Sequence, residues 1–78
     1  MKINLSQLIQ GQKGIIEDFD IDHVPLKLLE MGCLPGNEVQ LLQVAPMGDP
    51  LYLLVNDSHL AIRKETAQAI QVTISDAS

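Results

Sequence analysis

The 78-residue sequence is poor in aromatic residues and in positive charge. Phe19 and Tyr52 are its only aromatic side chains, so it lacks the stacking platforms on which single-stranded bases rest. Its five Lys and Arg residues are scattered and are outnumbered by ten Asp and Glu, which gives a net charge of −5 and no basic stripe for phosphates. Nucleic acid is therefore not an expected partner.

Cysteine and long apolar runs are scarce as well. Cys33 is the only cysteine, so no intrachain disulfide and no thiolate zinc cluster can form, which is typical of a reducing compartment. No apolar run approaches the roughly 18 residues of a membrane-spanning helix, and the N-terminus lacks a basic region followed by an apolar one. The sequence therefore predicts a cytoplasmic protein with no direct membrane insertion, which reaches membranes only through a partner.

Aliphatic residues are what the sequence has in quantity. Hydrophobic residues make up 46% of the chain, which is enough for one compact core. A chain of this size buries only about 60% of the surface that its unfolded form exposes, so it cannot be divided into smaller folding units. We expect a single domain over residues 1–74, followed by a disordered tail over residues 75–78.

The alternation of apolar and polar residues predicts about five short strands. These strands cover residues 14–19, 38–45, 51–55, 58–63 and 70–74. The phase of the second strand changes at Leu41 and Leu42, which predicts a bulge or a strong bend. In the first strand the inward face is ambiguous, because Ile15 and Ile16 point to opposite sides. With helical turns near both ends, the pattern is typical of a mainly β fold, a small SH3-like barrel of antiparallel strands with short helices.

A short helix is predicted over residues 24–31, between the first and second strands. Gly32 can take the left-handed conformation that ends a helix, and Asp22 is the expected N-cap. Pro35 and Gly36 then preset a turn into the next strand.

Two further turns join the later strands. Asn56 and Asp57 both tolerate positive φ and predict a tight hairpin. Gly48 lies in a Pro-Met-Gly-Asp-Pro turn, where we expect it to hold a backbone conformation that alanine cannot easily reach.

Four motifs follow one another along the chain. They are Leu28-Leu29-Glu30-Met31-Gly32, Pro35-Gly36 followed by Glu38-Val39, Ala45-Pro46-Met47-Gly48-Asp49-Pro50, and Leu60-Ala61-Ile62-Arg63-Lys64-Glu65-Thr66-Ala67. In this order and spacing they resemble the FeoA proteins of bacterial ferrous iron uptake, over about residues 5–74. The resemblance implies an SH3-like fold and a small cytosolic protein that binds the iron-transporting membrane GTPase FeoB. It implies no catalysis. The chain departs from the family pattern at Leu26-Lys27, where Arg is frequent, and at Cys33, where an aliphatic residue is usual.

An enzyme is the competing class, and the residues argue against it. His23 and His59, with Cys33 or Ser58, are the only candidates for a general base and a nucleophile. No Ser or Cys elbow, glycine-rich phosphate loop or pair of carboxylates accompanies them. The sequence therefore predicts a protein that is not an enzyme, with no catalytic residue and no cofactor.

The alternative function is a free-standing, metal-responsive regulatory domain of SH3-like fold that binds a divalent transition metal directly. Cys33, His23, His59 and nearby aspartates could converge in space to form such a site. No HxxxH or CxxC spacing supports it, and a lone buried cysteine is usually a small apolar residue. No metal ligand is assigned from the sequence.

The predicted helix has two groups of apolar side chains, and one of them is a candidate partner surface. Val24, Leu28 and Met31 lie within about 60° of one another around the helix axis and are expected to seal the barrel. Leu26 and Leu29 lie on a different side, and they are either buried as well, because a small domain is short of core material, or available to a partner. Together with residues of the following turns they form the expected partner-binding surface: Leu26, Leu29, Leu34 and Met47. Self-association into a homo-oligomer remains open at this point.

Overall fold

The computed structural model of the chain describes residues 1–19 and 22–74. The predicted disordered tail, residues 75–78, lies outside these ranges. The described elements are β1 (Lys2–Asn4), the 3₁₀ turn η1 (Leu5–Gln7), β2 (Lys13–Phe19), α1 (Leu26–Glu30), β3 (Glu38–Val44), β4 (Leu51–Val55), β5 (Ser58–Ile62), α2 (Lys64–Ala67) and β6 (Ile70–Ile74).

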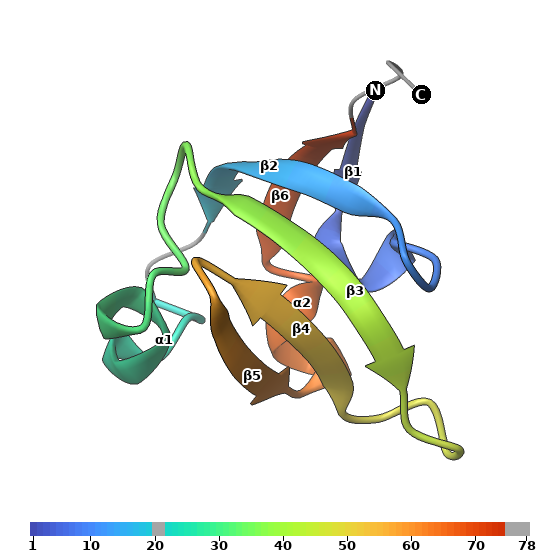
Figure 1. Ribbon diagram of the computed structural model, residues 1–78. Helices are drawn as coiled ribbons and strands as arrows, with labels where there is room; N and C mark the ends of the chain where they lie inside the picture. The colour runs from blue at the N-terminus through green and yellow to red at the C-terminus, as the bar shows by residue number, and fades with distance from the viewer. Residues whose placement is uncertain (20–21, 75–78) are drawn as a thin grey trace.

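Six antiparallel strands form one curled sheet in the order β1-β6-β2-β3-β4-β5. Strands β3, β4 and β5 form the near side in Figure 1, while β1 and β6 lie behind them and β2 passes over the top. The helix α1 lies at one end of the molecule, beside β5 and the start of β3 (Figure 1). The mainly β, SH3-like barrel that the sequence predicts is confirmed, with one strand more than expected.

The additional strand is β1, which has only three residues and therefore shows no alternation in the sequence. It is held by pairing with β6, where Lys2 is opposite Thr73 and Asn4 is opposite Gln71. Asn4 also caps η1, because its side-chain oxygen accepts a hydrogen bond from the Ser6 amide at 3.0 Å. The N-terminal segment is thus fixed by a distant strand, which local sequence cannot reveal.

The core fills the inside of the curled sheet and is built almost entirely from aliphatic side chains. In the described part of the chain no polar or charged side chain is buried. The buried residues are Leu5, Leu8, Ile16, Val24, Cys33, Val39, Leu41, Leu51, Leu53, Val55, Leu60, Ile62, Ala67, Ile70 and Val72. Because every strand from β2 to β6 contributes to this set, the sheet cannot open without exposing the core to water.

Two β-bulges decide which side chains enter the core. The register of β3 against β4 shifts between Leu41 and Gln43, so the predicted irregularity at Leu41-Leu42 is confirmed. A second shift occurs between Ile16 and Asp18 in β2, and it answers the ambiguity of that strand. With Glu17 as the extra residue, Ile16 and Phe19 both pack on the core side although they are three residues apart.

The helix α1 is shorter than the sequence pattern predicts, because it begins at Leu26 and not at Val24. Pro25 is the N-cap residue and no side chain caps the helix, so the prediction that Asp22 is the N-cap is wrong. The residue before a proline is disfavoured in the helical region, which keeps Val24 out of the helix. Val24 is nevertheless buried against the core, as predicted.

Both predicted turns have the expected backbone. Asn56 and Asp57 have φ values of 52° and 65°, which are those of a two-residue hairpin with both central residues at positive φ. Gly48 has a φ of 86° in the turn between β3 and β4. A side chain at position 48 would meet no atom within 4 Å, so only the backbone conformation opposes substitution there.

We therefore predict that Gly48→Ala lowers the free energy of unfolding by about 1 kcal/mol, because alanine must hold a left-handed backbone. Gly48→Asn is the matched control, since asparagine adopts this conformation more readily and should cost less. Urea denaturation of the three proteins measures the difference. Equal midpoints for glycine and alanine would show that this turn does not need its left-handed residue.

Candidate functional site

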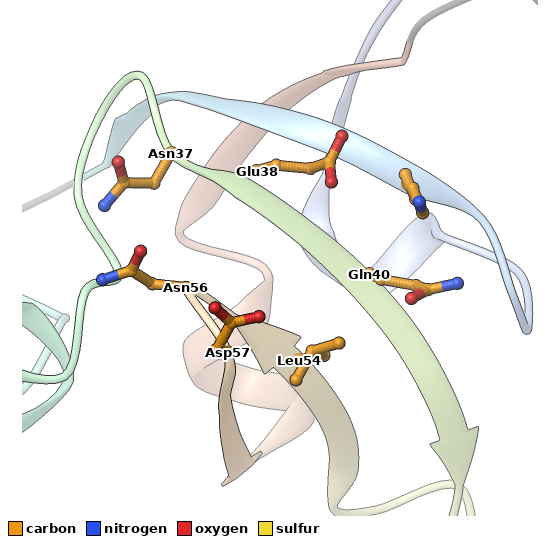
Figure 2. Close-up of a pocket in the computed structure, with 7 residues that line it drawn as sticks. Asn37, Glu38, Gln40, Leu54, Asn56 and Asp57 are labelled. Carbon is orange, nitrogen blue, oxygen red and sulfur yellow. The ribbon is translucent and has the colours of Figure 1, made fainter.

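A polar hollow of about 370 Å³ lies where β3 begins, beside the β4–β5 hairpin turn (Figure 2). Its lining residues are Lys13, Asn37, Glu38, Gln40, Leu54, Asn56 and Asp57. The Asn37 amide donates a hydrogen bond to the Gly32 carbonyl at 2.7 Å, and the Gln40 amide donates one to the Gly11 carbonyl at 3.2 Å. These amides therefore tie neighbouring loops together.

The carboxylates of this hollow, Glu38 and Asp57, are both exposed and come from different elements (Figure 2). The lining contains no histidine, cysteine or hydroxyl side chain. It therefore offers no pair of a nucleophile and a base, and its chemistry is that of a solvated surface.

A second concave region lies between α1 and the edge strand β5, and we call it the β5 groove. It consists of two adjoining hollows of about 260 Å³ each, which share Lys27, Leu28 and Ala61 in their linings. Its apolar lining residues are Pro25, Leu28, Met31, Leu60, Ala61 and Ile62. The polar ones are Lys27, His59, Arg63 and Thr66. Among the residues that the structure describes, the groove thus has an apolar floor with basic side chains and no carboxylate.

Sequence reasoning did not find the β5 groove. The alternation of residues 58–63 correctly turns Leu60 and Ile62 inward and His59 and Ala61 outward. The strand order of the sheet makes β5 an edge strand with α1 on its open side. No local sequence pattern contains this order. The available sequence signal is the late Ala61-Ile62-Arg63 motif.

The four predicted partner-binding residues do not form one surface. Leu26 and Leu34 are 68% and 43% exposed and both belong to the α1 end of the molecule, whereas Met47 is 92% exposed at the tip of the β3–β4 turn. Figure 1 shows that turn at the opposite end from α1. The seven-residue strand β3 runs between the two ends and spans roughly 20 Å. The expectation that Met47 lies beside the helix is therefore not met.

Leu29 also differs from the expected arrangement. The predicted core group of the helix is present, because Val24 is buried and Leu28 and Met31 pack against the core. Leu29, however, is half-buried and packs against the same core, so only Leu26 is left in solvent. A five-residue helix is little more than one turn, and both Leu28 and Leu29, which are about 100° apart around it, reach the core.

Cys33, the only thiol, is fully buried among apolar side chains. Burial raises the pKa of the Cys33 thiol, so the neutral form is favoured over the thiolate that binds metals. Within residues 1–19 and 22–74, no three His, Cys, Asp or Glu side chains gather as a metal-binding group. Cys33 thus acts as a small core residue at a position where an aliphatic side chain would serve equally well.

Comparison with known proteins identifies the family. A family model described as the FeoA domain matches residues 3–74, which is nearly the whole chain. The chain belongs to the FeoA family. This confirms the resemblance seen in the four sequence motifs. FeoA is an accessory family linked to ferrous iron transport and is not a known enzyme family.

Among curated relatives, an Fe(2+) transport protein A/Fe(2+) transporter FeoB fusion protein of Porphyromonas gingivalis (strain ATCC BAA-308 / W83) is 33% identical over 73 residues. The match covers 92% of the FeoA chain described here and 9% of the fusion protein. The chain therefore spans less than a tenth of that relative's length. Among the described residues of this FeoA chain, no helix is both long enough and apolar enough to cross a bilayer.

Solved structures of FeoA proteins share the fold. A crystal structure of an iron uptake regulatory protein (FeoA) is 33% identical, with a TM-score of 0.81 over 94% of this chain and 96% of the other. Stenotrophomonas maltophilia FeoA, crystallised as a complex with zinc and described as an SH3 domain protein, is 27% identical. Its TM-score is 0.74 over 97% of this chain and 93% of that one.

The burial of Cys33 leads to a prediction about its reactivity. The native protein should react with a disulfide reagent such as DTNB on the order of 100-fold more slowly than the guanidinium-unfolded chain. The reason is that the buried thiol reacts only when the fold opens locally, which costs about 3 kcal/mol. Equal reaction rates in the two states would contradict the burial of this side chain.

The burial of Cys33 also makes stability depend on pH. Because the pKa is raised in the folded state, the Cys33 contribution to stability is present below the unfolded pKa near 9.0 and is lost as the pH rises through the folded value.

Proposed function

We propose that this FeoA chain supports or regulates ferrous iron uptake by binding the cytosolic part of the FeoB transporter, without itself catalysing a reaction. The observation that supports this proposal best is the relative in which an FeoA segment and an FeoB transporter are one polypeptide. Covalent linkage holds two modules at high effective concentration, which is useful where they act on each other. In this proposal the chain binds the transporter through its own surface.

The α1 end of the domain is the surface that we assign to this contact. Leu26 and Leu34 are large apolar side chains exposed in a domain whose other aliphatic residues mostly fill the core. Exposed apolar side chains of this kind act as anchors when a partner removes them from water. Leu29 lies half-buried in the same helix and packs against the core. Met47 is a separate anchor at the other end of the molecule.

Copurification tests the proposal most directly. The cytosolic part of the transporter should retain the FeoA chain, and the comparison with and without guanine nucleotide shows whether the contact depends on the nucleotide state. The Leu26→Ala variant, which is expected to fold normally and to bind more weakly, controls for nonspecific capture. If the transporter part retains the chain neither with nor without guanine nucleotide, the proposal is wrong.

Three substitutions separate binding from folding. We predict that Leu26→Ala weakens transporter binding by about 1 to 2 kcal/mol and leaves thermal stability unchanged, because this side chain is 68% exposed. Leu28→Ala should lower stability by about 2 kcal/mol or more, since Leu28 packs against the core. Leu29→Ala, at a half-buried position, should lower both quantities.

Met47→Ala is the matched control for Leu26→Ala, because both positions are exposed and apolar but lie at opposite ends of the domain. Binding and melting are measured for all four variants. If Met47→Ala weakens binding and Leu26→Ala does not, the transporter contacts the β3–β4 turn and the assignment to α1 is wrong.

Direct binding of a divalent transition metal is the second candidate function, and the zinc complex of Stenotrophomonas maltophilia FeoA favours it. The described residues of this chain show no such site. Cys33 is buried and held in its neutral form, and no group of three ligand side chains forms among the residues described. We therefore infer that transporter binding does not depend on a metal held by this chain.

Anaerobic titration calorimetry with Fe²⁺, Mn²⁺ and Zn²⁺ tests this inference. We predict no one-to-one isotherm at micromolar or tighter affinity, because tight transition-metal sites need several converging ligands. A tight isotherm that Cys33→Ser or His23→Ala abolishes would establish the metal-responsive function instead.

A further inference from the structure

The strand β5 leaves one row of its backbone groups without a strand partner. Among residues 1–19 and 22–74 it pairs with β4 alone, and it is the last strand of the sheet order. Val55 and Ser58 flank the two-residue hairpin and form a hydrogen-bonded pair, so hydrogen-bonded and non-hydrogen-bonded pairs alternate from there. His59 and Ala61 fall in the non-hydrogen-bonded pairs. Their peptide N–H and C=O groups therefore point away from β4, along the open edge.

This open edge faces the β5 groove and not bulk solvent alone. The side chains that line the groove beside Ala61 include Leu28 from α1 and the edges of Leu60 and Ile62 from β5. Figure 1 shows α1 on the side of β5 opposite to β4. The groove thus combines unpaired strand backbone with an apolar floor, which is the combination that an added strand uses: the backbone gives affinity and the pockets select side chains.

The charged side chains around the β5 groove indicate which kind of peptide segment can bind there. Two of the five Lys and Arg residues of the chain, Lys27 of α1 and Arg63 after β5, line the groove, and no Asp or Glu of residues 1–19 and 22–74 lines it. This is unusual in a chain with ten carboxylates and a net charge of −5. Asp49 borders a separate hollow with Arg63, and its carboxylate accepts a hydrogen bond from the Lys64 amide at 2.9 Å.

We propose that the β5 groove binds an extended segment of a partner protein as an additional strand on β5, and that this segment alternates apolar and acidic side chains. Its backbone pairs with His59 and Ala61, its apolar side chains contact Leu28, and its carboxylates lie near Lys27 and Arg63. A second copy of this chain is a poor occupant, because pairing two β5 edges would bring the same basic side chains together. The proposal goes beyond transporter binding, since it holds for whichever protein supplies the segment.

The probe is the acetylated and amidated peptide Val-Glu-Val-Glu-Val-Glu-Val, titrated into ¹⁵N-labelled FeoA. Binding should shift the amide resonances of His59, Ala61 and Lys27, and it should slow the hydrogen exchange of the His59 and Ala61 amides. The same peptide with Lys in place of Glu is the charge control, and we expect it not to bind.

Backbone methylation tests strand addition without altering the protein. Successive N–H groups of a strand point to opposite edges, so methylating all Val amides and methylating all Glu amides block different edges of the peptide. One of the two methylated peptides should lose binding and the other should keep it. Equal binding by both would overturn the strand pairing.

Charge reversal tests the basic side chains. Lys27→Glu and Arg63→Glu should each weaken peptide binding roughly 3- to 10-fold, because each replaces an attractive exposed pair with a repulsive one. Lys2→Glu on β1, the opposite edge of the sheet, is the matched control and should leave affinity unchanged. Equal effects of all three would mean that only net charge matters and would overturn the assignment to this groove.

Ala61→Pro tests whether the outward backbone N–H of β5 contributes to peptide binding. Proline removes the outward N–H of residue 61, and edge strands tolerate it where no ladder bond is lost. The variant should fold and lose peptide binding at least tenfold. If the peptide fails to bind the native chain, or if a dimer of this chain protects His59 and Ala61, the inference is wrong while transporter binding is unaffected. If the peptide binds and the transporter does not, the proposed function fails and the groove assignment stands.

Discussion

The structure depends on closing a small sheet around a core that consists of aliphatic side chains. With Phe19 and Tyr52 as the only aromatics, and neither fully buried, no large ring fills the centre. Leucine, isoleucine and valine from several strands must therefore meet at close range, which requires a strongly curled sheet. The bulges in β2 and β3 allow this, because each inserts one residue where strict alternation would turn an apolar side chain outward. The exposed residues of the α1 end and the β5 groove both lie on the outside of the curled sheet.

Much of this fold could be read from the sequence, and the limits have physical reasons. The phase change at Leu41-Leu42, the hairpin at Asn56 and the left-handed Gly48 are local properties, since each depends on residues adjacent in the chain. The strand β1 is held by a partner 70 residues away, and the start of α1 is set by the effect of Pro25 on its neighbour. Local patterns give turns and periodicity well, but they do not give pairing between distant segments.

The candidate site was harder to predict than the fold for the same reason. Helical spacing separates Leu26 from Leu28 correctly, because angles around one helix turn are local. Whether Met47 joins them depends on which end of β3 the helix packs against, and the chain places them at opposite ends (Figure 1). A turn that is near in sequence order can be far in space when a full strand intervenes. The β5 groove shows the converse, since Leu28 and Ala61 are distant in sequence and line the same hollows.

The helix α1 is the element that the two proposed surfaces share. Leu26 projects into solvent, whereas Leu28 lines the groove and packs on the core, and Lys27 stands between them in the chain. A partner that covers Leu26 therefore approaches the basic side chain that would hold an acidic strand in the groove. Binding at either surface can change affinity at the other through steric overlap or charge alone, and no conformational change of the barrel is required. In a domain this small, whose core leaves little room for movement, such coupling through one short helix is the simplest physical route to regulation.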